Sequence, residues 1–125
     1  MGDIIQEEKK IGRLFAEAFG LTIAENFFST QIPADKINAA ALIFNGSNQG
    51  NYPAGEIYTA QILGRYQQRA DALSLCQKMD GVLPLYSPEC FIVKEGSAGV
   101  YFTSWNGIDA WGVSMNIRIY KNGKE

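Results

Sequence analysis

Apolar residues recur at two periods along the chain, and the change of period divides it into predicted helices and strands. Steps of three and four residues at the start predict a helix over Ile4–Phe19, with Asp3 as its N-cap and Gly20 as its stop. Glu7 and Glu8 are expected on its solvated side, close to the positive end of the helix dipole. The predicted apolar face comprises Ile4, Ile11, Leu14, Phe15 and Phe19.

The helical period returns from Gln67 onward and predicts a second helix. Gly81 and Pro84 mark where this helix is expected to fray and stop, because neither residue favours a helix interior. Cys76 is interpreted as a buried residue of this helix. The predicted buried face comprises Ala72, Cys76, Met79 and Leu83, with Leu73 beside it.

Six further segments have strand character, because each is an apolar or alternating run bounded by turn residues. The final segment alternates most clearly, with Trp111, Val113 and every second residue to Ile119 expected in the core. Its other face, which includes Arg118, is left to solvent or to a partner. The predicted strands are residues 26–32, 37–44, 56–66, 91–95, 100–104 and 111–120, and the predicted loops between them include 45–53, 96–99 and 106–109.

These elements follow the order α-β-β-β-α-β-β-β, which predicts an α+β fold. We expect a two-layer sandwich in which two helices cover one face of a mixed, mainly antiparallel sheet. The 125 residues contain no internal repeat and no linker, so a single domain over residues 1–125 is predicted. With 46% hydrophobic and 19% charged residues, the composition is that of an ordinary globular protein.

Charge and cysteine content narrow the classes of partner. The net charge is −2 and neither half of the chain is strongly basic, so no direct binding to nucleic acid is expected. No apolar run reaches the roughly 18 residues of a membrane span, and the N-terminus lacks the apolar core of a signal peptide. We therefore expect no membrane association and folding in a cytoplasm, where a Cys76–Cys90 disulfide is not expected because reduced cysteines are the default.

The residue types that most catalytic sites need are sparse. The chain has no histidine, which removes the commonest general base, the Ser-His and Cys-His pairs and His-containing metal sites. A carboxylate pair among the 13 acidic residues is the alternative, but the acidic positions on the helices are interpreted as solvated. The Gly/Asn-rich loop at 45–51 lacks the Gly-Lys-Ser/Thr ending of a phosphate-binding loop and is interpreted as a flexible connection. We expect a protein that is not an enzyme and needs no cofactor.

Several polar, glycine and aromatic positions are instead candidates for contact with another chain. Arg65 and Arg69 stand close together at a strand-to-helix junction, where they could pair with acids across an interface. Trp105 and Trp111 flank an Asn-Gly turn; exposed tryptophans anchor interfaces, whereas the alternation assigns Trp111 to the core and leaves Trp105 undecided. The candidate interface residues are Asn45, Gly50, Tyr52, Arg65, Arg69, Trp105 and Arg118.

Three stretches of the chain have a recognisable character. Residues 32–44 place a proline and an acid before a small, apolar strand, and residues 62–76 run from Ile-Leu-Gly-Arg into an alanine-containing helix. Residues 114–119 have the form Ser-x-Asn-x-Arg-Ile. In this order, the stretches resemble the small minor capsid or tail-terminator proteins of tailed bacteriophages and prophages. The resemblance extends from about Phe15 to Tyr120.

The resemblance implies a ring, typically of six copies, that caps the growing tail tube and joins it to the head, with no cofactor and no catalysis. The implied partners are copies of the same chain and the tail-tube and head-completion proteins, first in the host cytoplasm and then in the virion. A ring closes when one patch meets a different patch on the next copy, so Arg65→Glu is expected to leave a folded monomer and abolish closure.

Three alternatives stay open at this point. The first is another head-completion or tail subunit of similar fold. The second is a regulatory α+β domain that binds a small ligand near the Gly/Asn loop, and the third is an enzyme that uses carboxylates alone.

Overall fold

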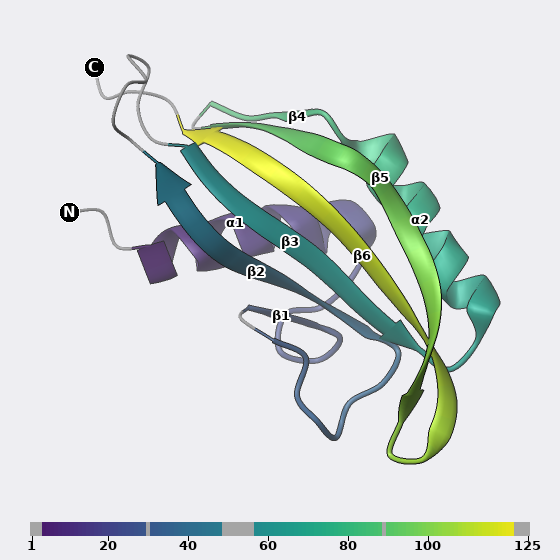
Figure 1. The fold of residues 1–125 in the computed structure, drawn as a ribbon. Coiled ribbons are helices and arrows are strands. Elements are labelled where there is room, and N and C mark those ends of the chain that lie inside the picture. Colours follow the sequence, from purple (N-terminus) through teal and green to yellow (C-terminus); the bar gives the residue numbers. More distant parts are fainter. Residues whose placement is uncertain (1–3, 30, 49–56, 89, 122–125) are drawn as a thin grey trace.

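The fold is known from a computed structural model that describes residues 4–29, 31–48, 57–88 and 90–121. The described residues form a mixed α+β structure with a curled six-stranded sheet and two helices (Figure 1). Neither helix is long and apolar enough to cross a membrane. The predicted N-cap Asp3 lies outside the described residues. The elements are α1 (Ile4–Phe19), β1 (Phe27–Ser29), β2 (Ala39–Asn48), β3 (Ile57–Tyr66), α2 (Arg69–Val82), β4 (Leu85–Tyr86), β5 (Cys90–Trp105) and β6 (Ile108–Lys121).

The strands lie in the order β1-β2-β3-β6-β5-β4. β1 pairs with β2 in parallel, and every other neighbouring pair is antiparallel, so the sheet is mixed and mainly antiparallel. β3 pairs with β6 only as far as Tyr66 and Trp111, whereas β5 and β6 stay paired to Trp105 and Ile108. The tip of the β5–β6 hairpin, residues 103–110, therefore extends past the end of β3, and this projection is visible in Figure 1.

One hydrophobic core contains side chains from both helices and from the sheet. Alternate residues of β3 are buried, and the predicted alternation of β6 is confirmed from Val113 to Ile119, while Trp111 is only half-buried. Burial of these side chains supplies the main stabilising term of the fold. The largest fully buried side chains are Phe15, Phe19, Phe27, Leu42, Ile62, Met79, Ile92, Val113, Met115, Ile117 and Ile119.

The end of α1 confirms the stop signal in the sequence. Gly20 has φ +74°, a left-handed conformation that glycine adopts without a steric penalty. Its N–H donates to the Glu17 carbonyl at 3.2 Å, and the Leu21 N–H donates to the Ala16 carbonyl at 2.8 Å. This pair of bonds is the Schellman arrangement, and it satisfies carbonyls that a helix end would otherwise leave without donors.

The buried face of α2 differs from the predicted one. The helix begins at Arg69, and its buried residues are Ala72, Leu75 and Met79. Leu73 is exposed and Cys76 is half-buried, so the interpretation of Cys76 as a buried residue is wrong. Gly64 explains the choice of Leu75, because a Cβ at Gly64 would lie 2.8 Å from Leu75 Cδ2. The missing side chain leaves room for Leu75 against β3.

The predicted division of β5 into two strands is also wrong. Residues 90–105 form one strand, and the Gly-Ser-Ala-Gly sequence at 96–99, which resembles a turn, is absorbed as an irregularity between Glu95 and Gly99. Pairing with β6 continues on both sides of it. β2 likewise runs on to Asn48, with a bulge between Phe44 and Gly46, so the predicted loop does not start at Asn45.

Glu8 was expected on the solvated side of α1 but is 5% exposed. Its Oε2 accepts a hydrogen bond of 2.8 Å from the backbone N–H of Phe44. β1 pairs with β2 only as far as Leu42, so β1 supplies no partner for the Phe44 N–H. The carboxylate of α1 satisfies this donor at the point where the short edge strand ends.

Candidate functional site

The end of the β5–β6 hairpin carries three of the exposed large apolar side chains among the described residues. Phe102 is 60% exposed, Tyr101 is 49% exposed and Ile108 is 47% exposed. From residue 99 to 113 the chain contains one charged residue, Asp109. Aromatic enrichment with depletion of charge distinguishes the centres of protein interfaces from the rest of a protein surface. By the register, Tyr101 and Ile108 lie on the face of Trp105, and Phe102 lies on the opposite face with Trp111; we call these three exposed residues together the hairpin patch.

Arg65 and Trp105, two of the predicted interface residues, meet on one face of this hairpin. The Arg65 guanidinium lies 5.9 Å from the centre of the Trp105 ring. It also donates to the backbone carbonyls of Pro33, at 2.7 Å, and Lys36, at 2.6 Å. The Trp105 indole N–H donates to the Ala34 carbonyl at 2.8 Å. The two side chains therefore hold segment 33–36 against one face of the hairpin.

Arg69 holds the hairpin from the other face. Its guanidinium lies 5.8 Å from the centre of the Trp111 ring, and Trp111 in turn packs edge-on against Phe102 with the ring centres 5.1 Å apart. Trp105 and Trp111 project to opposite faces, because Trp111 is three residues from Ile108, the partner of Trp105. One arginine–tryptophan pair on each face fixes the direction of the hairpin.

The other predicted interface residues lie elsewhere. Arg118 forms an ion pair with Glu95, and hydrogen bonding to Tyr120 together with that carboxylate raises the pKa of the guanidinium. By its pairing with Thr59 and Val93, Arg118 lies on the sheet face opposite the core. Asn45 is exposed at the β2 bulge. Gly50 and Tyr52 are outside the described residues.

A second aromatic group, which the sequence patterns did not single out, lies at the opposite end of the sheet. Tyr86 is 73% exposed and stacks on Phe91 with ring centres 4.6 Å apart. Phe91 stacks on Tyr120 with ring centres 6.1 Å apart. The register places the three residues on adjacent strands β4, β5 and β6. We call them the aromatic row.

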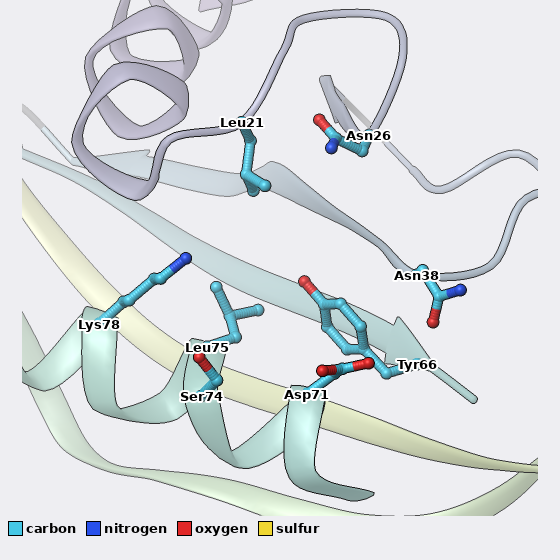
Figure 2. A pocket seen from close by; sticks show the side chains of 8 residues that line it. All are labelled: Leu21, Asn26, Asn38, Tyr66, Asp71, Ser74, Leu75 and Lys78. Carbon is cyan, nitrogen blue, oxygen red and sulfur yellow. The ribbon is translucent and has the colours of Figure 1, made fainter. Parts of the chain in front are cut away.

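A pocket of about 220 Å³ lies between α2 and the segment that leads from α1 to β2 (Figure 2). One face of α2 supplies four residues at helical spacing, and the rest come from three other parts of the chain. The Tyr66 hydroxyl points into the space, as Figure 2 shows. The lining residues are Leu21, Asn26, Asn38, Tyr66, Asp71, Ser74, Leu75 and Lys78.

Burial and the neighbouring Asp71 charge raise the pKa of Tyr66 to about 12. The hydroxyl is therefore protonated, and able to donate a hydrogen bond, at any physiological pH. Cys76 lies on another face of the same helix, where burial and then the Asp80 charge raise the pKa of its thiol. A raised pKa keeps this thiol protonated and unreactive at neutral pH. Cys76 and Cys90 are both free thiols.

Across the described ranges, no group of three or more His, Cys, Asp or Glu residues is placed to hold a metal ion. No family model matches the chain, and no curated protein is significantly similar to it.

Proposed function

We propose that this protein is a structural subunit of a phage or prophage virion that assembles into a closed ring of six copies, the number that its resemblance to tail terminators implies. The ring would cap the tail tube and join it to the head. The proposal includes the two-layer arrangement, in which the helices cover one face of the sheet and the other face is available to neighbours. It also takes the protein to be catalytically inactive and located at the head–tail junction.

The single observation that supports this proposal most is the hairpin patch. Its three side chains are about half exposed or more; Ile108 stands on the tip that passes the end of β3, and Tyr101 and Phe102 lie beside the last residues of β3. An arm of this kind gains from burial against another chain, since each aromatic side chain buries roughly 150–250 Å². The two arginine–tryptophan pairs fix the arm, so little conformational entropy is lost when it binds.

The positions of the hairpin patch and the aromatic row suit a contact that repeats around a ring. They lie at opposite ends of the β5–β6 ladder, which pairs continuously except at the Glu95/Gly99 irregularity. One copy can therefore offer its hairpin patch while its aromatic row receives the arm of the next copy. Such a head-to-tail contact uses two different surfaces, and it closes into a ring when the rotation per subunit returns to the start.

Phe102→Asp tests the contact, because it places a charge at the most exposed member of the hairpin patch. We expect the wild-type protein to reach six times 13.8 kDa in light scattering behind size exclusion, with rings in negative-stain images. The variant should stay at 13.8 kDa with a far-UV spectrum like that of the wild type. Ile23→Asp is the matched control, since Ile23 is also an exposed apolar residue but belongs to the segment after α1.

Arg65→Glu, the variant that the sequence points to, is a less selective test. It would also release the carbonyls of segment 33–36, so loss of assembly could follow from local unfolding. A folded Phe102→Asp protein that still forms rings would show that the hairpin patch is not the contact. A wild-type chain that stays monomeric at every concentration, and also fails to bind isolated tail tubes, would contradict the proposed function.

A further inference from the structure

The hydroxyl of Tyr66 has no hydrogen-bond partner among the described residues. The residue is only 8% exposed, and its hydroxyl points into the pocket between α2 and segment 21–38 (Figure 2). Within the described part of the chain this hydroxyl makes no hydrogen bond. The hydroxyl faces the open space of the pocket and is not one of the buried atoms without a partner, so a ligand that accepts from it would take the place of water.

Two asparagines add further donors to the same space. Asn26 Oδ1 accepts a 2.7 Å hydrogen bond from the Thr22 N–H, and Asn38 Oδ1 accepts a 3.1 Å bond from the Gln67 N–H. These bonds occupy the carbonyl ends of both side-chain amides. Each amide therefore keeps its NH₂ group to donate elsewhere.

The two charged side chains of the pocket stand at opposite ends of one helix face. Asp71 and Lys78 are seven residues apart on α2, which separates them by roughly 10 Å along the helix axis. Lys78 Nζ donates one hydrogen bond, of 3.2 Å, to the Phe19 carbonyl, and an ammonium group has three donors. Leu21 and Leu75 form apolar walls of the same pocket.

We propose that this pocket binds a small linear zwitterion, with a carboxylate at Lys78, an ammonium group at Asp71 and a short aliphatic chain between the two leucines. Tyr66 and the two asparagines donate hydrogen bonds to the carboxylate of the ligand or to a polar group on its aliphatic chain. The 220 Å³ volume limits the ligand, because it is below the roughly 300 Å³ at which pockets begin to hold drug-sized molecules. This site is independent of the proposed ring, and either proposal can fail alone.

Calorimetric titration of the wild-type protein with 6-aminohexanoate tests the site, with hexanoate and hexylamine as single-charge controls of equal length. Hexanoate has no ammonium group to pair with Asp71, and hexylamine has no carboxylate to pair with Lys78. We therefore expect 6-aminohexanoate to bind at least about tenfold more tightly than either control. Absence of saturable binding up to about 20 mM, or equal affinity for the zwitterion and a single-charge control, would overturn the proposal.

Variants assign the binding to this pocket. Lys78→Gln and Asp71→Asn should each abolish the preference for the zwitterion. Tyr66→Phe should weaken binding about fivefold without lowering the melting temperature, because the hydroxyl makes no hydrogen bond to any residue that the structure describes. Lys94→Gln is the control, since Lys94 pairs with Asp80 at 2.8 Å and is not part of the lining. Binding that survives all three pocket substitutions would place the ligand elsewhere and refute the assignment.

Discussion

The hydrogen bond between Glu8 and the backbone of Phe44 gives a direct test of how the edge of β2 is stabilised. Glu8→Ala removes the carboxylate that accepts from the Phe44 N–H. Since Glu8 is 5% exposed, the N–H would be left in a site that water reaches poorly. An unsatisfied buried donor costs about 1–3 kcal/mol, so we expect the free energy of unfolding to decrease by about 2 kcal/mol.

Thermal and urea unfolding measure this effect with two controls. For a chain of this length, about 2 kcal/mol corresponds to a melting temperature lower by roughly 6–10 °C. Glu8→Gln keeps an acceptor oxygen and should cost less than about 1 kcal/mol. Glu17→Ala removes an exposed carboxylate from the same helix and should change stability by less than about 0.5 kcal/mol.

The comparison between the alanine variants decides the interpretation. If Glu8→Ala and Glu17→Ala have the same stability, then water or a shifted backbone satisfies the Phe44 N–H, and the edge does not depend on Glu8. If Glu8→Gln is as unstable as Glu8→Ala, the negative charge is the important property and the hydrogen bond alone is an insufficient account.

Two further predictions concern Tyr66 and Arg65. Because the pKa of Tyr66 is raised from its usual value near 10 to about 12, the native state favours the neutral phenol, and the free energy of unfolding should fall as pH rises from about 10 to about 12. Urea unfolding across this range measures the fall, and Tyr66→Phe should reduce it; an equal fall in both proteins would contradict the assignment. Arg65→Lys replaces a planar fork that reaches two carbonyls with a single ammonium group, so it should cost about 1–2 kcal/mol in urea unfolding. Wild-type stability in this variant would show that segment 33–36 is held by other contacts.

Local signals predicted a large part of the fold. The helix stop at Gly20 depends on one residue's conformational freedom, and the β6 alternation depends on a period of two, so both can be read without knowing the rest of the chain. The extent of β5 could not be read in this way, because Gly-Ser-Ala-Gly is a turn signal unless β6 continues to pair on both sides of it. The burial of Leu75 in place of Leu73 depends on space left by Gly64 on another strand.

In the candidate sites, too, residue type identified single residues, whereas contacts between segments distant in the sequence could not be predicted. Arg65, Arg69 and Trp105 were singled out by residue type, and the structure brings all three to one hairpin. Their carbonyl partners in segment 33–36 were not predictable, since about 30 residues separate them from Arg65. The polar pocket was missed because its lining comes from four separate parts of the chain, although the spacing of Asp71, Ser74, Leu75 and Lys78 did define one helix face.

The two irregularities of the sheet have opposite effects on the direction of side chains. At the β2 bulge one extra residue, Asn45, is inserted, so even-numbered positions face the core before it and the register with β3 shifts by one residue after it. In β5, residues 96–98 stand opposite Met115 alone, which adds two residues and leaves odd and even positions on their original faces. An insertion or deletion at 96–98 therefore keeps every side chain of the hairpin on its present face of the sheet only if it adds or removes an even number of residues. A one-residue deletion there would exchange the exposed and buried sets of every position on one side of it.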